Sequence, residues 1–211
     1  MSADDEDEAS PGGRRLIGLG LALLLALGLV VALSPALFDR LRQSAALVGG
    51  DVIEPHFALT DSSGRIVSEA DFRGRFVLLL FGYTACADIC PTSLAIVAGA
   101  LDRLPSEQAA RIVPIFVTLD PERDDPLTAS RYAAAFSPRL IGLGGTVAQI
   151  DAALRSFRVY RARVPGSAPD LYTLDHSALL YLVDPEGRFR ATFDPGQGAP
   201  ALVEGLAQAV R

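Results

Sequence analysis

Two cysteines separated by three residues are the part of this sequence best suited to chemistry. Cys86 and Cys90 lie in the stretch FGYTACADICPTSL, and the chain of 211 residues contains no other cysteine. Thiols at this spacing can form a stabilising disulfide, act as a redox couple, or bind a metal ion as thiolates. A disulfide across so short a loop constrains the unfolded chain little, so a purely structural bond would stabilise the protein only weakly.

Pro91 indicates where the helix after the cysteines begins. Proline lacks an amide hydrogen and fits the first helical turn, whereas deeper inside a helix it costs about 3 kcal/mol. We therefore expect the helix to start close to Cys90, with Cys86 in the preceding loop. Unpaired amide hydrogens and the helix dipole at such an N-terminus favour thiolates, which are the nucleophilic and metal-binding form of cysteine.

The chain has two histidines that could supply a third ligand. His176 lies in YTLDHSALLYLVD, just before an apolar run, and we expect it on a loop beside the cysteines; a hydrogen-bonding role is the alternative. His56 is expected at the surface, and Asp175 could either orient the His176 ring or cap a turn. Two thiolates and an imidazole suit Cu(I), or Cu(II) with an added oxygen or water, whereas structural zinc would need a fourth protein ligand.

The elements that must position these residues alternate between strands and helices. HFALT and RIVS predict a hairpin, and FVLLLF (76–81) and IVPIFVTL (112–119) predict buried strands, the second with a bulge or later start at Pro114. Further along, the patterns predict helices after the cysteines and over 127–136, 147–160 and 199–210, a short strand within 140–145, and a hairpin from 178–183 and 188–193. This order predicts an α/β thioredoxin-like fold, with a central mixed sheet flanked by helices.

The N-terminal part of the chain carries a long apolar segment. We expect residues 1–15 to be a disordered cytoplasmic tail, 16–38 a transmembrane anchor, 39–50 a tether, and 51–211 the folded copper-binding domain. Every residue from Leu16 to Leu33 is Leu, Ile, Val, Ala or Gly, and with the next few residues this stretch can cross a bilayer. A cleaved secretory signal is the alternative, although its apolar region is usually shorter.

The charges flanking this segment do not set its orientation, because arginines stand at both ends. A short N-terminal segment before a large domain most simply leaves the tail in the cytoplasm. We therefore expect a single-pass protein of the inner membrane with its folded domain on the periplasmic side. The net charge is −6, and no basic cluster is dense enough to indicate nucleic-acid binding.

Four motifs in a fixed order carry a family resemblance. FGYTACADICPTSL, VTLDPERDDP, FSPRLIGLGGT and DHSALLYLVDPEGRF resemble the Sco/SenC proteins, which are membrane-anchored, thioredoxin-like copper proteins of cytochrome c oxidase assembly. The resemblance spans residues 49–211 and implies that Cys86, Cys90 and His176 bind copper. Ala87 replaces the proline of the family pattern C-P-D-x-C-P, which removes some loop rigidity but leaves the ligand set intact.

The resemblance implies two functions that share the same thiols. A copper metallochaperone would deliver copper to the dinuclear copper centre of the copper-receiving oxidase subunit. A thiol–disulfide oxidoreductase would reduce that subunit's cysteines without carrying metal. The two differ over His176, which only the metallochaperone requires. A peroxiredoxin-like peroxidase would need an isolated nucleophilic cysteine, and the close pair argues against it.

Overall fold

The computed structural model describes residues 53–166 and 171–211 of the chain. The folded part is a compact unit from Ile53 to Arg211. The predicted tail (1–15), anchor (16–38) and tether (39–50) lie outside the described residues, so they remain predictions. Among the residues that are described, none of the helices combines the length and apolar character needed to cross a membrane.

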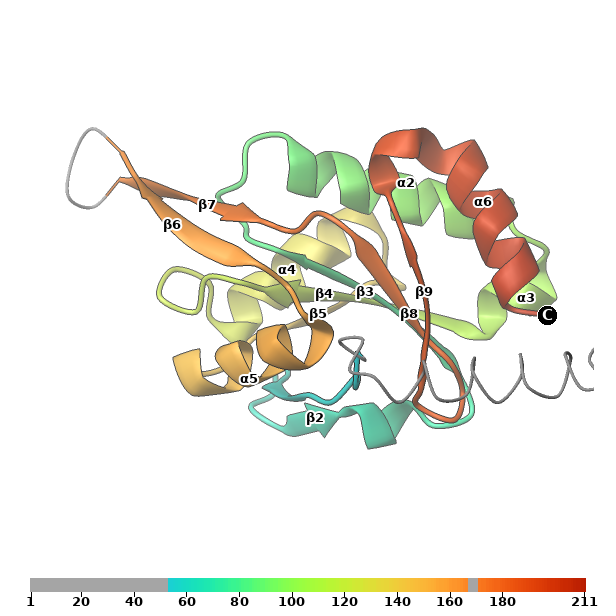
Figure 1. The fold of residues 1–211 in the computed structure, drawn as a ribbon, viewed down its shortest axis with the longest axis horizontal. Coiled ribbons are helices and arrows are strands. Elements are labelled where there is room, and N and C mark those ends of the chain that lie inside the picture. The colour runs from blue at the N-terminus through green and yellow to red at the C-terminus, as the bar shows by residue number, and fades with distance from the viewer. Residues whose placement is uncertain (1–52, 167–170) are drawn as a thin grey trace, which may run out of the picture. The chain divides into compact units, whose positions relative to one another are not determined.

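A five-stranded mixed sheet, in the order β5-β4-β3-β8-β9, forms the centre of this unit (Figure 1). The strands are β3 (Phe76–Gly82), β4 (Ile112–Thr118), β5 (Ile141–Leu143), β8 (Leu180–Val183) and β9 (Phe189–Phe193). β3, β4 and β5 run parallel, whereas β8 and β9 are antiparallel to their neighbours. Parallel strands joined by helices and followed by an antiparallel hairpin make the predicted thioredoxin-like fold.

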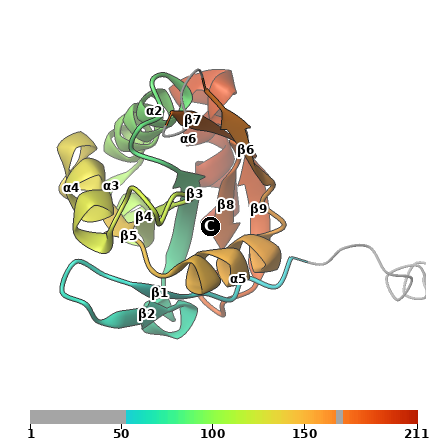
Figure 2. The ribbon, with the colours of Figure 1, turned by 90° about the vertical axis from the view of Figure 1, so that its left-hand side faces the viewer.

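Helices cover both faces of the sheet (Figure 2). One face packs against α2 (Ile89–Arg103), α3 (Ser106–Ala110), α4 (Pro126–Phe136) and α6 (Gly198–Ala209), the last preceded by the 3-10 turn η2 (Pro195–Gln197). The other packs against α5 (Val147–Phe157), the 3-10 turn η1 (Glu69–Phe72) and the antiparallel hairpin of β1 (Ala58–Thr60) and β2 (Ile66–Ser68).

The period of two along β3 supplies both apolar cores. Val77, Leu79 and Phe81 belong to the cluster on the α5 side, while the intervening Leu78 and Leu80 belong to the cluster on the α2 side. Each such side chain contributes about 1.5–3 kcal/mol when fully buried. A strand that is apolar at every position therefore packs against helices on both of its faces.

The segment after α5 differs from the prediction. The helix ends at Phe157 rather than Tyr160, because Arg158 takes up a left-handed conformation with φ of 56°. The chain then forms β6 (Arg161–Pro165), which pairs antiparallel with β7 (Tyr172–His176). Neither strand was predicted. His176 was expected on a loop but is the last residue of β7, because residues 172–176 alternate between half-buried and exposed side chains along a paired strand.

The expectation of a bulge or a later start at Pro114 is wrong, because β4 starts at Ile112 in unbroken register with β3. The carbonyl oxygen of Arg111 and the amide of Leu119 both form hydrogen bonds with β3. The backbone hydrogen-bonding groups of the even-numbered residues of β4 therefore point away from β3, toward the side of β5. This applies to Pro114, but β5 pairs with β4 only from Ile115 onward. The missing amide hydrogen falls at an open sheet edge, where proline is tolerated.

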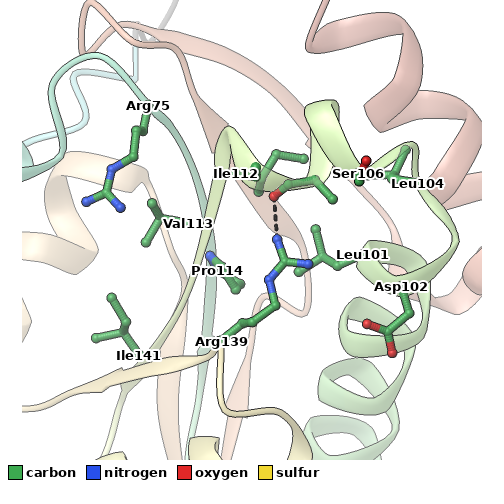
Figure 3. Close-up of a pocket in the computed structure, with 12 residues that line it drawn as sticks. Arg75, Leu101, Asp102, Leu104, Ser106, Ile112, Val113, Pro114, Arg139 and Ile141 are labelled. Atoms are coloured by element: carbon green, nitrogen blue, oxygen red, sulfur yellow. Dashed lines mark hydrogen bonds between the residues drawn. The ribbon is translucent and has the colours of Figure 1, made fainter.

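A cavity of about 580 Å³ lies at this open edge. Figure 3 shows Pro114, Val113 and Ile141 in its wall, with the guanidinium of Arg139 donating a hydrogen bond to the carbonyl oxygen of Ala109. The cavity is at the amino end of β4, whereas the cysteines follow the carboxyl end of β3, which runs parallel to β4. It contains none of the predicted site residues.

Candidate metal centre

The loop between β3 and α2 places the two sulfurs at a helix N-terminus. β3 ends at Gly82, and α2 begins at Ile89, one residue before Cys90. Cys90 is 1 % exposed, while Cys86 is partly exposed in the loop, and both are free thiols. The helix start and the loop position of Cys86 are as predicted. The amide of Cys90 donates a hydrogen bond to the sulfur of Cys86 over 3.4 Å, which holds the two residues in one turn.

The end of β7 brings His176 to the cysteines. Its Nε2 lies 3.7 Å from the sulfur of Cys90. Its Nδ1 lies 2.9 Å from the carbonyl oxygen of Ser177. A carbonyl oxygen only accepts, so Nδ1 carries the proton of the neutral ring and the lone pair of Nε2 faces the sulfur. The carbonyl of Ser177, rather than the carboxylate of Asp175, is therefore the group that orients this imidazole.

The spacing of these atoms fits a shared metal ion. Two ligands bound at ~2.1 Å and ~2.3 Å with an angle near that of trigonal or tetrahedral coordination lie ~3.6–3.8 Å apart. The distance of 3.7 Å between Cys90 and His176 agrees with this value. Within the described residues, however, no three His, Cys, Asp or Glu side chains already surround a common metal position. Cys86 would complete the ligand set by rotating its side chain toward the sulfur of Cys90 and the imidazole of His176.

The two thiols differ in acidity. Burial would raise the pKa of Cys86, but hydrogen bonds from the backbone amides of Cys90 and Asp88 outweigh burial and lower it below its ordinary value. Burial raises the pKa of Cys90 to about 12, and the neighbouring Cys86 adds to the effect. In the copper-free protein Cys86 is therefore the thiol that ionises first, and Cys90 holds its proton through the neutral range.

Gly82 makes room for the buried sulfur. A Cβ atom built at this position would lie 2.8 Å from the sulfur of Cys90 and 3.1 Å from the ring of Phe116. Both distances are shorter than ordinary van der Waals contact. The last residue of β3 must therefore lack a side chain if Cys90 is to lie against the end of the sheet.

Tyr83 and Thr84 connect this loop to its surroundings. The ring of Tyr83 meets the ring of His176 edge-on, with centroids 5.9 Å apart. The amide of Thr84 donates to the carboxylate of Asp124 over 2.9 Å, and Asp124 is 1 % exposed. Sequence reasoning missed Asp124, although a run of acidic residues directly after a buried strand was the available signal.

His56 does not join the site. Its Nδ1 pairs with Glu69 over 3.0 Å, and its side chain is exposed, as predicted for a surface residue. Glu69 belongs to η1, which packs on the α5 side of the sheet. Of the two histidines, the described structure therefore brings one to the cysteines.

Comparison with known proteins identifies the family. The SCO1/SenC family model matches residues 46–211. The chain is 40% identical over 169 residues to the mitochondrial protein SCO2 homolog of Mus musculus, an alignment that covers 80% of this chain and 64% of that protein. The chain thus spans less than two thirds of the length of the first curated relatives that it matches.

Two solved structures share the fold over most of the described residues. Arabidopsis thaliana ScoI with copper bound has a TM-score of 0.70 and 34% identity, covering 75% of this chain and 98% of that one. Bradyrhizobium japonicum ScoI with copper bound has a TM-score of 0.66 and 39% identity, covering 74% and 99%. Because the SCO1/SenC family model matches the whole folded part, the chain belongs to the SCO1/SenC family.

Proposed function

We propose that this protein is a copper metallochaperone that holds one copper ion between Cys86, Cys90 and His176. It would pass the ion to the dinuclear copper centre of cytochrome c oxidase, or help that centre to mature. The observation that carries the proposal is the distance of 3.7 Å between His176 Nε2 and the sulfur of Cys90. Further support comes from the copper-bound ScoI structures of Arabidopsis and Bradyrhizobium.

The ligand set suits transient binding. Two thiolates and one imidazole can satisfy Cu(I), which accepts low coordination. Cys86 is partly exposed, so a thiolate of the recipient can approach the ion from that side. It would displace Cys86 as the first of the three ligands. Cys90 and His176 would hold the ion until the recipient has bound it. The recipient is proposed to be the copper-receiving oxidase subunit.

A thiol–disulfide oxidoreductase is the second candidate, and the lowered pKa of Cys86 favours it. The thiolate of Cys86 would attack a disulfide of the recipient, and Cys90 would then displace the second sulfur. The recipient's disulfide is reduced to two thiols while Cys86 and Cys90 become a disulfide. The second step needs Cys90 as a thiolate, and its pKa of about 12 makes that step slow at neutral pH. Copper binding also needs this thiolate, so the ranking rests on His176, whose Nε2 lies 3.7 Å from the Cys90 sulfur and which reduction does not require.

The location of the protein is also a proposal. The apolar residues 16–38 would anchor it in the inner membrane, and the unit from Ile53 would then face the periplasm.

Replacing the histidine separates the two candidates. In the full-length reduced protein, His176→Ala should weaken Cu(I) binding by well over tenfold, measured by competition with a chromophoric chelator. His56→Ala is the matched control, because it removes the chain's other histidine, which pairs with Glu69 away from the cysteines. Equal Cu(I) affinity in the wild type and in His176→Ala would overturn the proposed ligand set and leave the oxidoreductase.

Oxidation gives an independent test of the same ligands. A disulfide between Cys86 and Cys90 removes both thiolates, so the oxidised protein should not bind Cu(I). Titration of the oxidised and reduced forms with Cu(I) measures this directly. Equal binding by the two forms would exclude the thiols as ligands.

A further inference from the structure

The loop from Leu119 to Asp125, between β4 and α4, contacts both segments that carry the proposed ligands. One segment is the cysteine loop after β3, and the other is β7, which ends at His176. These segments are far apart in the chain, and they meet directly where His176 Nε2 lies 3.7 Å from the Cys90 sulfur and where Tyr83 packs edge-on against His176. A single long contact to sulfur does not by itself fix the distance between the sulfurs and the imidazole, so other parts of the fold must contribute to it.

Asp124 attaches this loop to the cysteine loop. Its carboxylate accepts hydrogen bonds from the amide and the hydroxyl of Thr84, two residues before Cys86. It accepts a third from the hydroxyl of Thr118 on β4, over 2.7 Å. A carboxylate that is 1 % exposed and accepts three hydrogen bonds is held rigidly, and loss of one partner leaves a costly buried polar group.

Arg123 attaches the same loop to β7. Its guanidinium lies 3.6 Å from the centroid of the Tyr172 ring, and its Nη1 donates to the Tyr172 carbonyl oxygen over 3.0 Å. Arg163 lies over the same ring, also at 3.6 Å, so the ring is stacked between two cations. Asp120 connects Arg123 to Tyr172. Its carboxylate accepts a hydrogen bond from Arg123 and another, over 2.6 Å, from the hydroxyl of Tyr172.

The two attachments meet at the aromatic residue between them. Tyr83 precedes Thr84 in the cysteine loop, lies 5.7 Å from the guanidinium of Arg123, and packs edge-on against His176. The consecutive residues Arg123 and Asp124 thus contact the two segments that carry the proposed ligands. A shift of this loop would move the imidazole relative to the sulfurs.

We infer that Arg123 and Asp124, two residues of the loop 119–125, set the separation between the sulfurs and the imidazole as positioning residues. Asp124 fixes the cysteine loop, and Arg123 fixes the strand that ends at His176. The inference rests on the proposed copper site, to which it adds residues that do not touch the ion. Groups that hydrogen-bond a metal ligand directly typically change metal affinity by about 10–100-fold when they are replaced. Arg123 and Asp124 act one contact further out, so we expect effects near the lower end of this range.

The first experiment replaces each positioning residue conservatively in the full-length protein. Arg123→Lys keeps the positive charge but loses the flat stack, and Asp124→Asn keeps the shape but loses acceptor capacity. Each should weaken Cu(I) binding about tenfold or more. Asp125→Asn is the matched control, because Asp125 caps α4 by accepting from Thr128, and asparagine is an equally good cap. Its Cu(I) affinity should equal that of the wild type.

A double-mutant cycle shows whether each residue acts through the ligand assigned to it. In a His176→Ala background, Arg123→Lys should cost no further Cu(I) affinity, because the ligand that it positions is already gone. Asp124→Asn should keep its full effect there, because it acts on the cysteines. Tyr172→Leu removes the ring on which Arg123 stacks. Like Arg123→Lys, it should weaken Cu(I) binding in the wild type and cost no further affinity in the His176→Ala background. If the effect of Arg123→Lys adds fully to that of His176→Ala, the inference is wrong.

A copper-free readout keeps this test separate from the proposed function. The nuclear Overhauser contact between the rings of Tyr83 and His176 should weaken in copper-free Arg123→Lys and persist in Asp125→Asn. If the wild type binds no Cu(I), the proposed function fails and this contact alone decides the inference. If the wild type binds Cu(I) and both positioning variants bind equally well with the ring contact unchanged, the inference is overturned while the proposed function stands.

Discussion

Cys86 and Cys90 differ in burial, and this difference has consequences for copper binding. The sulfur of Cys90 lies against the end of the sheet, and burial raises its pKa to about 12. Amide hydrogen bonds lower the pKa of Cys86 despite its partial burial. In the proposed site copper binds both residues as thiolates, so binding would displace any proton that the free protein still holds.

We predict a pH dependence of Cu(I) affinity with two slopes. Below the pKa of Cys86 both thiols release a proton on binding, so the logarithm of the affinity should rise by about two per pH unit. Above that pKa only Cys90 releases one, and the slope should fall to about one up to pH 12 or so. Competition titrations across the pH range in which the protein stays folded measure both slopes. An affinity independent of pH would contradict thiolate ligation.

Gly82→Ala should damage the site from inside the sheet. The new methyl group would lie 2.8 Å from the sulfur of Cys90 and 3.1 Å from the Phe116 ring, so one of them must move. We expect a lower free energy of unfolding, by about 1–3 kcal/mol as for other overpacked cores, together with weaker Cu(I) binding. Urea denaturation and chelator competition measure the two effects.

Gly99→Ala is the control for this substitution. Gly99 lies within α2, and a Cβ atom there would meet nothing within 4 Å. Alanine should raise the free energy of unfolding by about 0.5–1 kcal/mol, because glycine is a poorer helix former. Its Cu(I) affinity should not change. If Gly82→Ala behaved in the same way as Gly99→Ala, the close approach of Cys90 would be refuted.

At the residue scale, the sequence predicted what depends on local chemistry. Pro91 placed the helix start, and the spacing of the cysteines placed one in the loop and one in the helix. The contact between His176 and the carbonyl of Ser177, the next residue, was not predicted, because it depends on the ring orientation at the end of β7, which no sequence pattern fixes. The role of the Asp124 carboxylate was not predicted, because its bond to Thr84 forms only when segments 40 residues apart meet. The ligand assignment itself stays a prediction.

At the scale of elements, α4 depends on its N-cap. The carboxylate of Asp125 accepts from the amide of Thr128, and Pro126 occupies the first helical position. We predict that Asp125→Ala lowers the free energy of unfolding by about 1 kcal/mol, measured by urea denaturation. Cu(I) affinity should stay unchanged, because Asp124, not Asp125, holds the cysteine loop. A loss of copper binding in Asp125→Ala would show that the helix start and the site are coupled.

The apolar runs predicted the central strands, because β3 and β4 are buried at every position and show no other pattern. β6 and β7 were missed because their side chains are half-buried or exposed, so neither carries a strong apolar signal. Their pairing depends on contacts such as the stack of Tyr172 between two arginines. Pro114 was misjudged because its tolerance depends on where β5 begins, which the sequence of β4 alone cannot tell.

At the scale of the whole molecule, the folded unit should keep its structure and its Cu(I) affinity without the proposed anchor. A chain beginning at Ile53 contains the whole compact unit, and we predict that it folds and binds Cu(I) as tightly as the full chain. The full chain should fractionate with membranes. A membrane-impermeant thiol reagent should label Cys86 in cells with a permeabilised outer membrane. Labelling that appears only after lysis of the inner membrane would contradict the periplasmic location.

The most direct test of the account is X-ray absorption at the copper edge of the reduced full-length protein loaded with one equivalent of Cu(I). We predict a coordination shell of two sulfur atoms and one imidazole nitrogen, with the nitrogen contribution lost in His176→Ala and kept in His56→Ala. A wild-type spectrum with sulfur ligands alone, unchanged by His176→Ala, would contradict the central claim that strand β7 delivers the third ligand.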